Sequence, residues 1–330
     1  MSGLPTVTPV INVVGATATG KSDLAVALAQ ELDGEIINAD AMQFYRGMDI
    51  GTAKLPVAER GGIPHHLLDV LEVSEDASVA VYQGWARALV ARIRERGHVP
   101  IIVGGSGLYV RAATDHMGFP GTDPAVRARL EAEADEQGSR MLHARLRQVD
   151  PAAAAKIEPG DSRRVVRALE VVELTGEPFS AHLPRYEYWT PTVQIGLAQD
   201  RPTLHARIAE RVGRMWEAGW VDEVRALLGR GLLEGTTARK AIGYAEILDH
   251  LDGRMTPEDA IDRSIVRTRQ FAKRQETWFR RDDRIHWLPA GRVDAPGNTL
   301  LADATGIFRT ADAFTQDGTH DDDHRNRTDH

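Results

Sequence analysis

A loop near the start of the chain combines the residue types that hold phosphate groups. It consists of Gly15, Ala16, Thr17, Ala18, Thr19, Gly20, Lys21 and Ser22, and it fits the pattern G-x-x-x-x-G-K-[ST]. The apolar run at 10–14 predicts a buried strand before the loop, and the apolar spacing at 23–32 predicts a helix after it. In that context the loop N–H groups and the positive helix end face an anion, Lys21 adds a cation, and the Ser22 hydroxyl can bind Mg²⁺. We therefore expect residues 15–22 to bind a diphosphate or triphosphate.

A carboxylate and a glycine-rich turn are expected beside this phosphate loop. Residues 35–39 predict a second buried strand that ends at Asp40, and residues 101–103 predict a third, followed by the glycine-rich stretch 104–107. Ligands in open α/β sheets gather outside the carboxyl ends of the strands, so Asp40 is a candidate base or metal ligand. The alternatives are that Asp40 only caps the next turn and that residues 104–107 only form a tight turn.

The stretch 258–281 predicts a helix with two basic stripes. At about 100° per residue, one line holds Arg263, Arg267, Arg274 and Arg281, and another holds Arg269, Lys273 and Arg280. The predicted buried stripe consists of Ile261, Ile265, Ala272 and Phe279. Residues 263–284 contain eight basic and three acidic side chains, although the whole chain has a net charge of -8. We expect this helix to contact a polyanion; the alternatives are a solvated face or ion pairs within the protein.

Strands that are each followed by a turn and a helix predict an α/β fold, with a parallel sheet and helices on both faces. Residues 123–188 differ, because three charged, alanine-rich helical patterns follow one another there without a strand between them. We interpret 123–188 as a helical insertion domain within a core formed by 1–122 and 189–295, where the strand at 192–198 and a helix at 203–228 resume the sheet. Residues 296–330 form a separate C-terminal segment.

Composition excludes several kinds of protein. The 330 residues include no cysteine, so disulfides, thiolate zinc sites, iron–sulfur clusters and cysteine nucleophiles are excluded. No stretch is long and apolar enough to span a bilayer, and the start of the chain lacks the features of a signal peptide. We expect a cytoplasmic protein that does not bind membranes. Residues 311–330 hold six Asp and two Arg, a composition that predicts a disordered acidic end.

Five segments together resemble a known family. The segments 15–22, 40–54, 104–109, 241–244 and 272–280 look like successive signatures of the bacterial tRNA dimethylallyltransferases, also called tRNA isopentenyltransferases. The resemblance implies a nucleotide-kinase-like phosphate-loop core with a helical insertion. It also implies transfer of a dimethylallyl group from dimethylallyl diphosphate to the exocyclic amine (N6) of the adenosine 3′ of the anticodon in tRNA, with Mg²⁺ as cofactor. The expected partners are the tRNA anticodon stem-loop and dimethylallyl diphosphate, and the expected state is a monomer.

The resemblance also assigns roles to individual residues. Residues 17–22 would hold the diphosphate, with Ser22 as the metal ligand, and Asp40 would accept the proton from the adenine amine. The implied catalytic set is Asp40, Lys21, Ser106 and Arg211. The expected tRNA contacts are Asp40, Ala41, Met42, Gln43, Ser106, Arg127, Arg163, Arg164, Arg167, Lys240, Gly243, Tyr244, Arg267, Lys273, Arg274 and Arg281. The last four of these come from the two basic stripes of 258–281 and not from the resemblance. The chain departs from the family pattern at Ala16, Ala41 and Ser106, where proline, serine and threonine are usual.

Two other functions are compatible with parts of the sequence. A small-molecule kinase could use the same loop with ATP, but it would not need the basic helix or the insertion. A phosphate-loop protein that only binds nucleic acid would not need Asp40 at the end of a strand. Allylic transfer would use the phosphate loop, Asp40 and the basic helix with the insertion. The loop would bind the departing diphosphate, Asp40 would act on the weakly nucleophilic amine, and the basic helix and insertion would bind the RNA.

Overall fold

The computed structural model describes residues 7–182 and 186–317, which form two compact units. The first unit comprises Met1–Thr114 and Tyr188–His330 and contains the sheet, and the second comprises Asp115–Glu187 and is helical. The sequence analysis placed the insertion at 123–188, so the second unit begins eight residues earlier than that range. Among the described residues, no helix is both long and apolar enough to cross a membrane.

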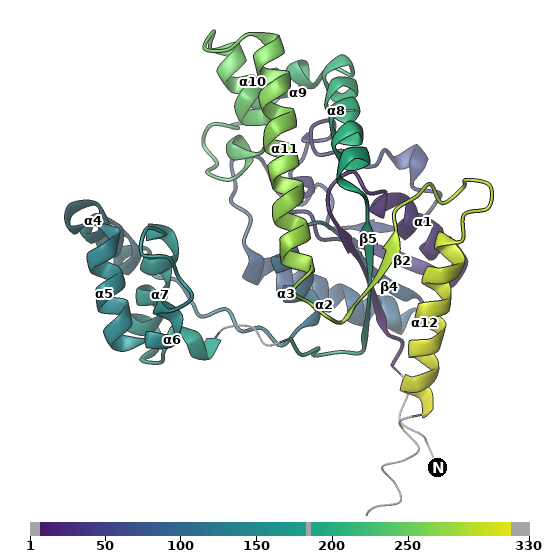
Figure 1. The fold of residues 1–330 in the computed structure, drawn as a ribbon, viewed down its shortest axis with the longest axis horizontal. Coiled ribbons are helices and arrows are strands. Elements are labelled where there is room, and N and C mark those ends of the chain that lie inside the picture. Colours follow the sequence, from purple (N-terminus) through teal and green to yellow (C-terminus); the bar gives the residue numbers. More distant parts are fainter. Residues whose placement is uncertain (1–6, 183–185, 318–330) are drawn as a thin grey trace, which may run out of the picture. The chain divides into compact units, whose positions relative to one another are not determined.

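A parallel sheet forms the centre of the first unit (Figure 1). In the described residues its strands are β1 (Val10–Gly15), β2 (Gly34–Asn38), β3 (His65–His66), β4 (Val99–Val103), β5 (Thr192–Ala198) and β6 (Ile285–Pro289), in the order β3-β2-β4-β1-β5-β6. Every neighbouring pair is parallel. The four predicted strands are confirmed, and β3 and β6 were not predicted. β3 has only two residues, and β6 lies at the sheet edge with exposed His and Trp side chains that hide its pattern.

Helices cover both faces of the sheet, as predicted. On one face α1 (Lys21–Leu32) and α12 (Leu300–Asp317) pack on a core that includes Ile11 and Val13 of β1. The opposite face carries α2 (Val79–Glu95) and α3 (Gly107–Thr114). There Asn12 of β1 donates a hydrogen bond of 3.1 Å to the Thr114 hydroxyl. Side chains alternate across a strand, so neighbouring residues of β1 face the two layers.

The helix α12 corrects the interpretation of 296–330 as a segment separate from the core. Leu300, Ala304 and Phe308 repeat every four residues and are all buried against the face that also holds α1. The predicted disorder from 311 onward is also wrong for 311–317, which are helical, while 318–330 lie outside the described residues. The acidic composition concealed the helix because its apolar stripe lies upstream of most of the charge.

A helical extension rises from β5 and contains α8 (Arg201–Glu217), α9 (Trp220–Leu228), α10 (Tyr244–Leu251) and α11 (Pro257–Phe279) (Figure 1). The single helix predicted at 203–228 is broken, because Gly219 takes a φ of 95° and starts a new helix. These helices share a second core with residues 45–48, which follow the short 3-10 helix η1 (Ala41–Phe44). Two further 3-10 turns, η2 (Val57–Glu59) and η4 (Ala238–Lys240), lie in this unit.

The second unit consists of α4 (Pro124–Gln137), α5 (Ser139–Val149), α6 (Pro151–Ala154), α7 (Ser162–Thr175) and the turn η3 (Phe179–His182). Asp123, Asp150 and Asp161 cap three of these helices through side-chain hydrogen bonds to backbone N–H groups. Leucine and valine side chains on α4, α5 and α7 form its own core. The predicted helices at 125–137, 139–149 and 162–175 are confirmed.

Candidate active site

The loop at 15–22 has the backbone geometry of an anion cradle. Gly15 has a φ of 137°, and a Cβ there would lie 2.7 Å from the Leu197 carbonyl oxygen of β5, so only glycine fits. Ala18 and Gly20 also take positive φ angles, of 64° and 89°. No side chain caps the N-terminus of α1. The first N–H groups of α1 and its positive dipole end are therefore available to an anion.

Two cations meet in this cradle. The Lys21 ammonium donates a hydrogen bond of 2.6 Å to the Ala16 carbonyl, and Arg211 of α8 donates one of 2.7 Å to the Thr17 hydroxyl. Burial and the nearby Arg211 charge lower the pKa of Lys21 to about 8. The Nε of Arg211 is buried and has no partner among the described residues. Two close positive charges with an unused buried donor favour a bound anion at this position.

Asp40 follows β2 and lies at the same end of the sheet as the cradle. Its Oδ1 accepts a 3.0 Å hydrogen bond from the Met42 N–H, so the residue does cap η1. Burial raises the pKa of the Asp40 carboxyl. The Met42 N–H and the Lys21 and Arg211 charges act in the opposite direction on that pKa but do not outweigh burial. A carboxylate with a raised pKa is a stronger base than an ordinary one, so the cap and the base can be the same residue.

A cavity of about 450 Å³ joins these groups. Its lining includes Thr17, Lys21, Ser22, Asp40, Gln43, Gly104, Gly105 and Arg211. The carboxyl ends of β2, β4 and β1 lie side by side in the sheet, so the residues that follow these three strands meet at the cavity. The structure therefore brings together the predicted diphosphate loop, the predicted base and Arg211.

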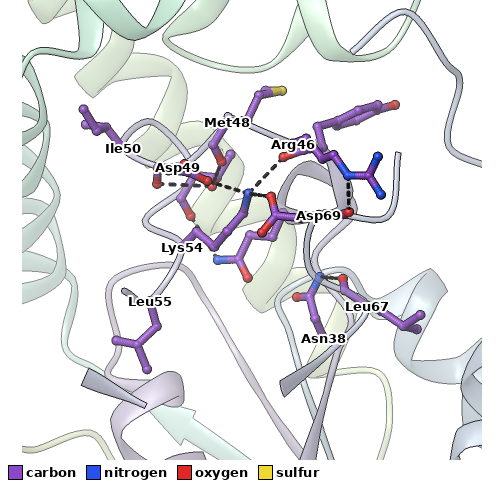
Figure 2. Close-up of polar contacts among 12 residues, drawn as sticks. Asn38, Arg46, Met48, Asp49, Ile50, Lys54, Leu55, Leu67 and Asp69 are labelled. Carbon is purple, nitrogen blue, oxygen red and sulfur yellow. Dashed lines mark hydrogen bonds and ion pairs between the residues drawn. The ribbon is translucent and has the colours of Figure 1, made fainter. Parts of the chain in front are cut away.

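The segment that follows Asp40 is organised around one buried lysine, Lys54 (Figure 2). Its ammonium donates hydrogen bonds to the Tyr45 carbonyl (2.9 Å), the Asp49 carboxylate (2.6 Å) and the Asp69 carboxylate (2.6 Å). The Gln43 side-chain amide donates to the Thr52 carbonyl at 3.1 Å and closes the same segment. These contacts fix residues 41–43, which are partly exposed beside Asp40.

Gly105 and Gly107 are explained by packing against α11. A Cβ on Gly105 would lie 2.1 Å from the Gln275 side-chain nitrogen, and one on Gly107 would lie 1.8 Å from Trp278 Nε1. None of the glycines at 104, 105 and 107 has a positive φ, so close approach of other segments requires them, not turn geometry. The neighbouring segment is α11 for Gly105 and Gly107, whereas a Cβ on Gly104 would lie 2.6 Å from the Ala39 carbonyl oxygen. Ser106 is partly exposed between them, directly before α3. Sequence reasoning missed Gln275, whose only signal is a polar residue at a buried helical spacing.

The buried face of the basic helix α11 contains both polar and apolar side chains. Ala272 and Phe279 are buried as predicted, but Ile261 and Ile265 are only half-buried. The buried line is Ala260, Ser264, Thr268, Ala272, Gln275 and Phe279. On the exposed side a hollow of about 430 Å³ is lined by Gln270, Lys273, Arg274, Thr277, Trp278 and Arg281. This hollow combines exposed cations with a partly exposed indole, a pairing suited to RNA phosphates and bases.

Arg267 differs from the other arginines on its stripe. Its guanidinium is paired with the carboxylate of Glu246, which is only 1% exposed, and Arg263 lies 3.8 Å from the same carboxylate. Glu246 also accepts a 2.7 Å hydrogen bond from the Gly243 N–H. Arg267 is therefore paired within the protein, and its contact with tRNA stays a prediction. Arg274 and Arg281 remain exposed.

Replacing Arg267 by Ala should lower the free energy of unfolding by about 1–3 kcal/mol, because a buried carboxylate loses its closest cation. Arg274→Ala on the same helix is the matched control and should change that free energy by no more than about 0.5 kcal/mol. Urea unfolding of both variants measures the difference. Equal unfolding free energies, together with weaker tRNA binding by the Arg267 variant, would contradict the structural role.

Two other predicted tRNA contacts, Tyr244 and Gly243, lie within the packing of α10. Tyr244 is fully buried, donates a 2.5 Å hydrogen bond to Glu223 and packs against Trp220. Gly243 is buried under Trp220, where a Cβ would lie 1.8 Å from the indole ring. Both residues are buried in this structure, and their contact with tRNA stays a prediction. Lys240, in contrast, is exposed.

The arginines of the second unit fall into two groups. Arg127 and Arg167 lie 2.5 and 2.8 Å from the carboxylate of Glu170, which is fully buried. Burial acts to raise the pKa of Glu170, but these two cations outweigh it and hold the pKa below its usual range. Arg163 and Arg164 are exposed on α7. The structure thus gives Arg127 and Arg167 a part in holding α4 and α7 together. Of the two exposed arginines, Arg164 lies 3.4 Å from the Asp161 carboxylate.

Comparison with known proteins identifies the family. A sequence model described as IPP transferase matches residues 43–282. The chain belongs to the IPP transferase family. The tRNA dimethylallyltransferase of Kineococcus radiotolerans is 60% identical to this protein over 87% of this chain and 92% of its own. The tRNA dimethylallyltransferase of Thermobifida fusca is 61% identical over 87% of this chain and 91% of its own.

Solved structures agree with this family assignment. The full-length tRNA isopentenylpyrophosphate transferase of Bacillus halodurans matches with a TM-score of 0.70 and 40% identity, covering 95% of this chain and 99% of its own. A eukaryotic dimethylallyltransferase acting on tRNA matches with a TM-score of 0.78 and 29% identity, covering 94% of this chain and 79% of its own. These IPP transferases therefore share the fold across nearly the whole chain.

Proposed function

We propose that this IPP transferase transfers a dimethylallyl group from dimethylallyl diphosphate to N6 of the adenosine 3′ of the anticodon in tRNA and releases diphosphate. The observation that supports it best is the meeting of the Asp40 carboxylate with Lys21 and Arg211 in one cavity at the phosphate loop. That cavity offers cations for a leaving diphosphate and a base for an amine. The relatives are named tRNA dimethylallyltransferases, which supports the dimethylallyl group and tRNA as substrates.

In the proposed reaction the C–O bond between the prenyl carbon and diphosphate breaks, and a bond from that carbon to the adenine N6 forms. Positive charge develops on the prenyl group while negative charge leaves with the diphosphate. The loop amides, Lys21 and Arg211 stabilise the leaving group. The amine becomes acidic as its new bond forms, and Asp40 accepts its proton. The cations therefore act on the leaving group, and no bond to phosphorus changes.

We further propose that Mg²⁺ accompanies the diphosphate, held by the Ser22 hydroxyl. The donor set fits a hard cation, since Ser22 and Asp40 place oxygen atoms around the same cavity. No cluster of three His, Cys, Asp or Glu side chains suited to a metal occurs in residues 7–182 or 186–317. Mg²⁺ commonly binds through one or two protein oxygens together with substrate phosphates, and keeps several waters. Bound Mg²⁺ would add charge neutralisation for the diphosphate.

For the RNA we propose the anticodon stem-loop of tRNA. The target amine lies within a stacked loop, so the adenosine must leave the stack to reach Asp40. Lys273, Arg274 and Arg281 of α11 would bind phosphates, and Arg163 and Arg164 of the second unit offer a further basic face. We propose a monomer that acts in the cytoplasm, where its RNA substrate is found.

A transfer assay distinguishes this function from that of a small-molecule kinase. None of the relatives named above is described as a kinase. The protein is incubated with unfractionated tRNA and either labelled dimethylallyl diphosphate or γ-labelled ATP, with Mg²⁺. Label from the prenyl donor should enter tRNA, and nuclease digestion should place it on one adenosine. Phosphate transfer from ATP without prenyl transfer would overturn the proposal.

Replacing Arg274 and Arg281 together by Ala should weaken tRNA binding and reduce its salt dependence by about one to two units of log–log slope. Each lost phosphate contact releases about one counterion fewer. Affinity measured at several salt concentrations gives the slope for each protein. The control is dimethylallyl diphosphate affinity, which should hardly change. An unchanged slope would show that this face of α11 does not bind RNA.

A further inference from the structure

The side chain of Gln275 joins the phosphate loop to the loop after β4. Its Oε1 accepts a 2.8 Å hydrogen bond from the Thr17 N–H, and its Nε2 donates one of 2.8 Å to the Gly105 carbonyl. Gln275 is 5% exposed, and Gly105 has no side chain, which lets the amide lie directly over it. A carboxamide is the side-chain group that supplies both an acceptor and a donor at these positions.

Thr17 is therefore held from two helices. Gln275 of α11 binds its backbone N–H, and Arg211 of α8 binds its hydroxyl at 2.7 Å. Without Gln275, the Thr17 N–H and the Gly105 carbonyl would each lose a partner in a largely buried place, which costs more than a surface hydrogen bond. The loop could then relax toward other conformations. The shape of the cradle at 15–22 thus depends on where α11 lies.

We propose that Gln275 is a positioning residue, which sets the diphosphate cradle and the Ser106 loop from the same helix whose outer face carries Lys273, Arg274 and Arg281. The proposal rests on the proposed function, because it takes residues 15–22 as the diphosphate site and the exposed side of α11 as the RNA site. RNA bound to that outer side would be separated from the Gln275 amide by the width of α11 alone. Movement of α11 on binding RNA would reach Thr17 and Gly105 through the two hydrogen bonds.

The test uses inorganic pyrophosphate with Mg²⁺ as the probe, measured by isothermal titration, on the full chain. Gln275→Met keeps the length of the side chain but removes both hydrogen bonds, and it should weaken pyrophosphate binding by about tenfold. Gln148→Met, at an exposed glutamine of α5, is the matched control and should bind as the wild type does. Affinity for unfractionated tRNA should stay within about twofold of the wild type for both variants, since neither change removes a phosphate contact.

A second variant separates hydrogen bonding from packing. In Gln275→Glu the introduced carboxylate accepts from the Thr17 N–H but faces the Gly105 carbonyl with a second oxygen, so it should bind pyrophosphate more weakly than the Met variant at about pH 8. Once protonated, the carboxyl donates to that carbonyl as the amide does. Near about pH 5.5 the Glu variant should therefore bind more tightly than the Met variant, because burial raises the pKa of the introduced group.

Each outcome bears on a specific claim. The role of Gln275 would be overturned if the Met variant bound pyrophosphate as tightly as the wild type. It would also be overturned if the same one of the Met and Glu variants bound pyrophosphate more tightly at both pH values. A loss of tRNA affinity and of melting temperature as large as the loss of pyrophosphate binding would also overturn it, since α11 would then have detached. Pyrophosphate binding that behaves as expected in a protein without prenyl transfer would overturn only the proposed function. Failure of the wild type to bind pyrophosphate would overturn both.

Discussion

Replacing Asp40 by Asn is expected to slow dimethylallyl transfer by about 10² or more while tRNA and dimethylallyl diphosphate bind nearly as in the wild type. Asparagine has the same shape and keeps an oxygen for the Met42 N–H, which Asp40 accepts at 3.0 Å. The cap of η1 should therefore survive, and only the base is removed. Single-turnover transfer of labelled prenyl group, with separate binding measurements for both substrates, checks this result.

The matched control for this change is Asp135→Asn, at an exposed position of α4. It makes the same chemical substitution and should leave the transfer rate unchanged. If Asp40→Asn lost substrate binding and rate to the same extent, Asp40 would be a structural cap and the base would have to be another group. A variant that kept the wild-type rate would likewise remove Asp40 from the mechanism.

The pH dependence of the same reaction provides an independent check on Asp40. The base acts as the carboxylate, which is present above its pKa, so the rate should fall as the pH is lowered through that value. Burial raises the pKa of Asp40, and this acid-side decline should therefore occur above the ordinary range for an aspartate. In the Asp40→Asn variant the remaining slow rate should lack this decline.

Much of the candidate site could be predicted because its parts are local in sequence. A strand, a glycine loop and a helix follow one another at 10–32, and each has a recognisable pattern. The position of Asp40 followed from a general rule about the carboxyl ends of parallel strands, without knowledge of the strand order. The structure places β4 between β2 and β1, so the three loops do meet.

The remaining parts depend on contacts between residues distant in sequence. Helical periodicity grouped Arg267 with Arg274 and Arg281, but it gave no sign that Glu246, on another helix, would pair with Arg267 and leave the other two exposed. The same limit applies to Lys54, whose burial depends on the distant Asp69, and to Gln275, whose partners lie 258 and 170 residues away. Helical periodicity shows which residues share one face of a helix, but the residues that contact that face depend on the tertiary fold.

Replacing Lys21 by Ala is expected to weaken dimethylallyl diphosphate by about 10²-fold, roughly 3 kcal/mol, and to leave tRNA affinity almost unchanged. The ammonium is one of two cations in the cradle, and among the described residues its hydrogen-bond partner is the Ala16 carbonyl of its own loop. It can turn from that carbonyl to the diphosphate at little cost. Isothermal titration with the diphosphate, and salt-matched binding of tRNA, measure the two affinities.

Two further variants show whether charge is the cause. Lys156→Ala removes a cation from an exposed position of the second unit and should leave diphosphate affinity as in the wild type. Lys21→Met keeps most of the side-chain length and should bind the diphosphate as weakly as Lys21→Ala. Diphosphate affinity close to that of the wild type in either Lys21 variant would mean that the loop does not use this lysine to hold the leaving group.

The pKa of Lys21 predicts how the affinity for dimethylallyl diphosphate changes with pH. Because burial and Arg211 lower that pKa to about 8, the free protein holds the cation below about pH 8 and loses it above. The cationic form binds the anion, so wild-type affinity for dimethylallyl diphosphate should be full below that pH and should fall above it by up to about tenfold per pH unit. Binding above that pH should take up a proton, which titrations in buffers of different ionisation enthalpy detect. The decline should disappear in Lys21→Met, and a decline of the same size in that variant would assign it to another group.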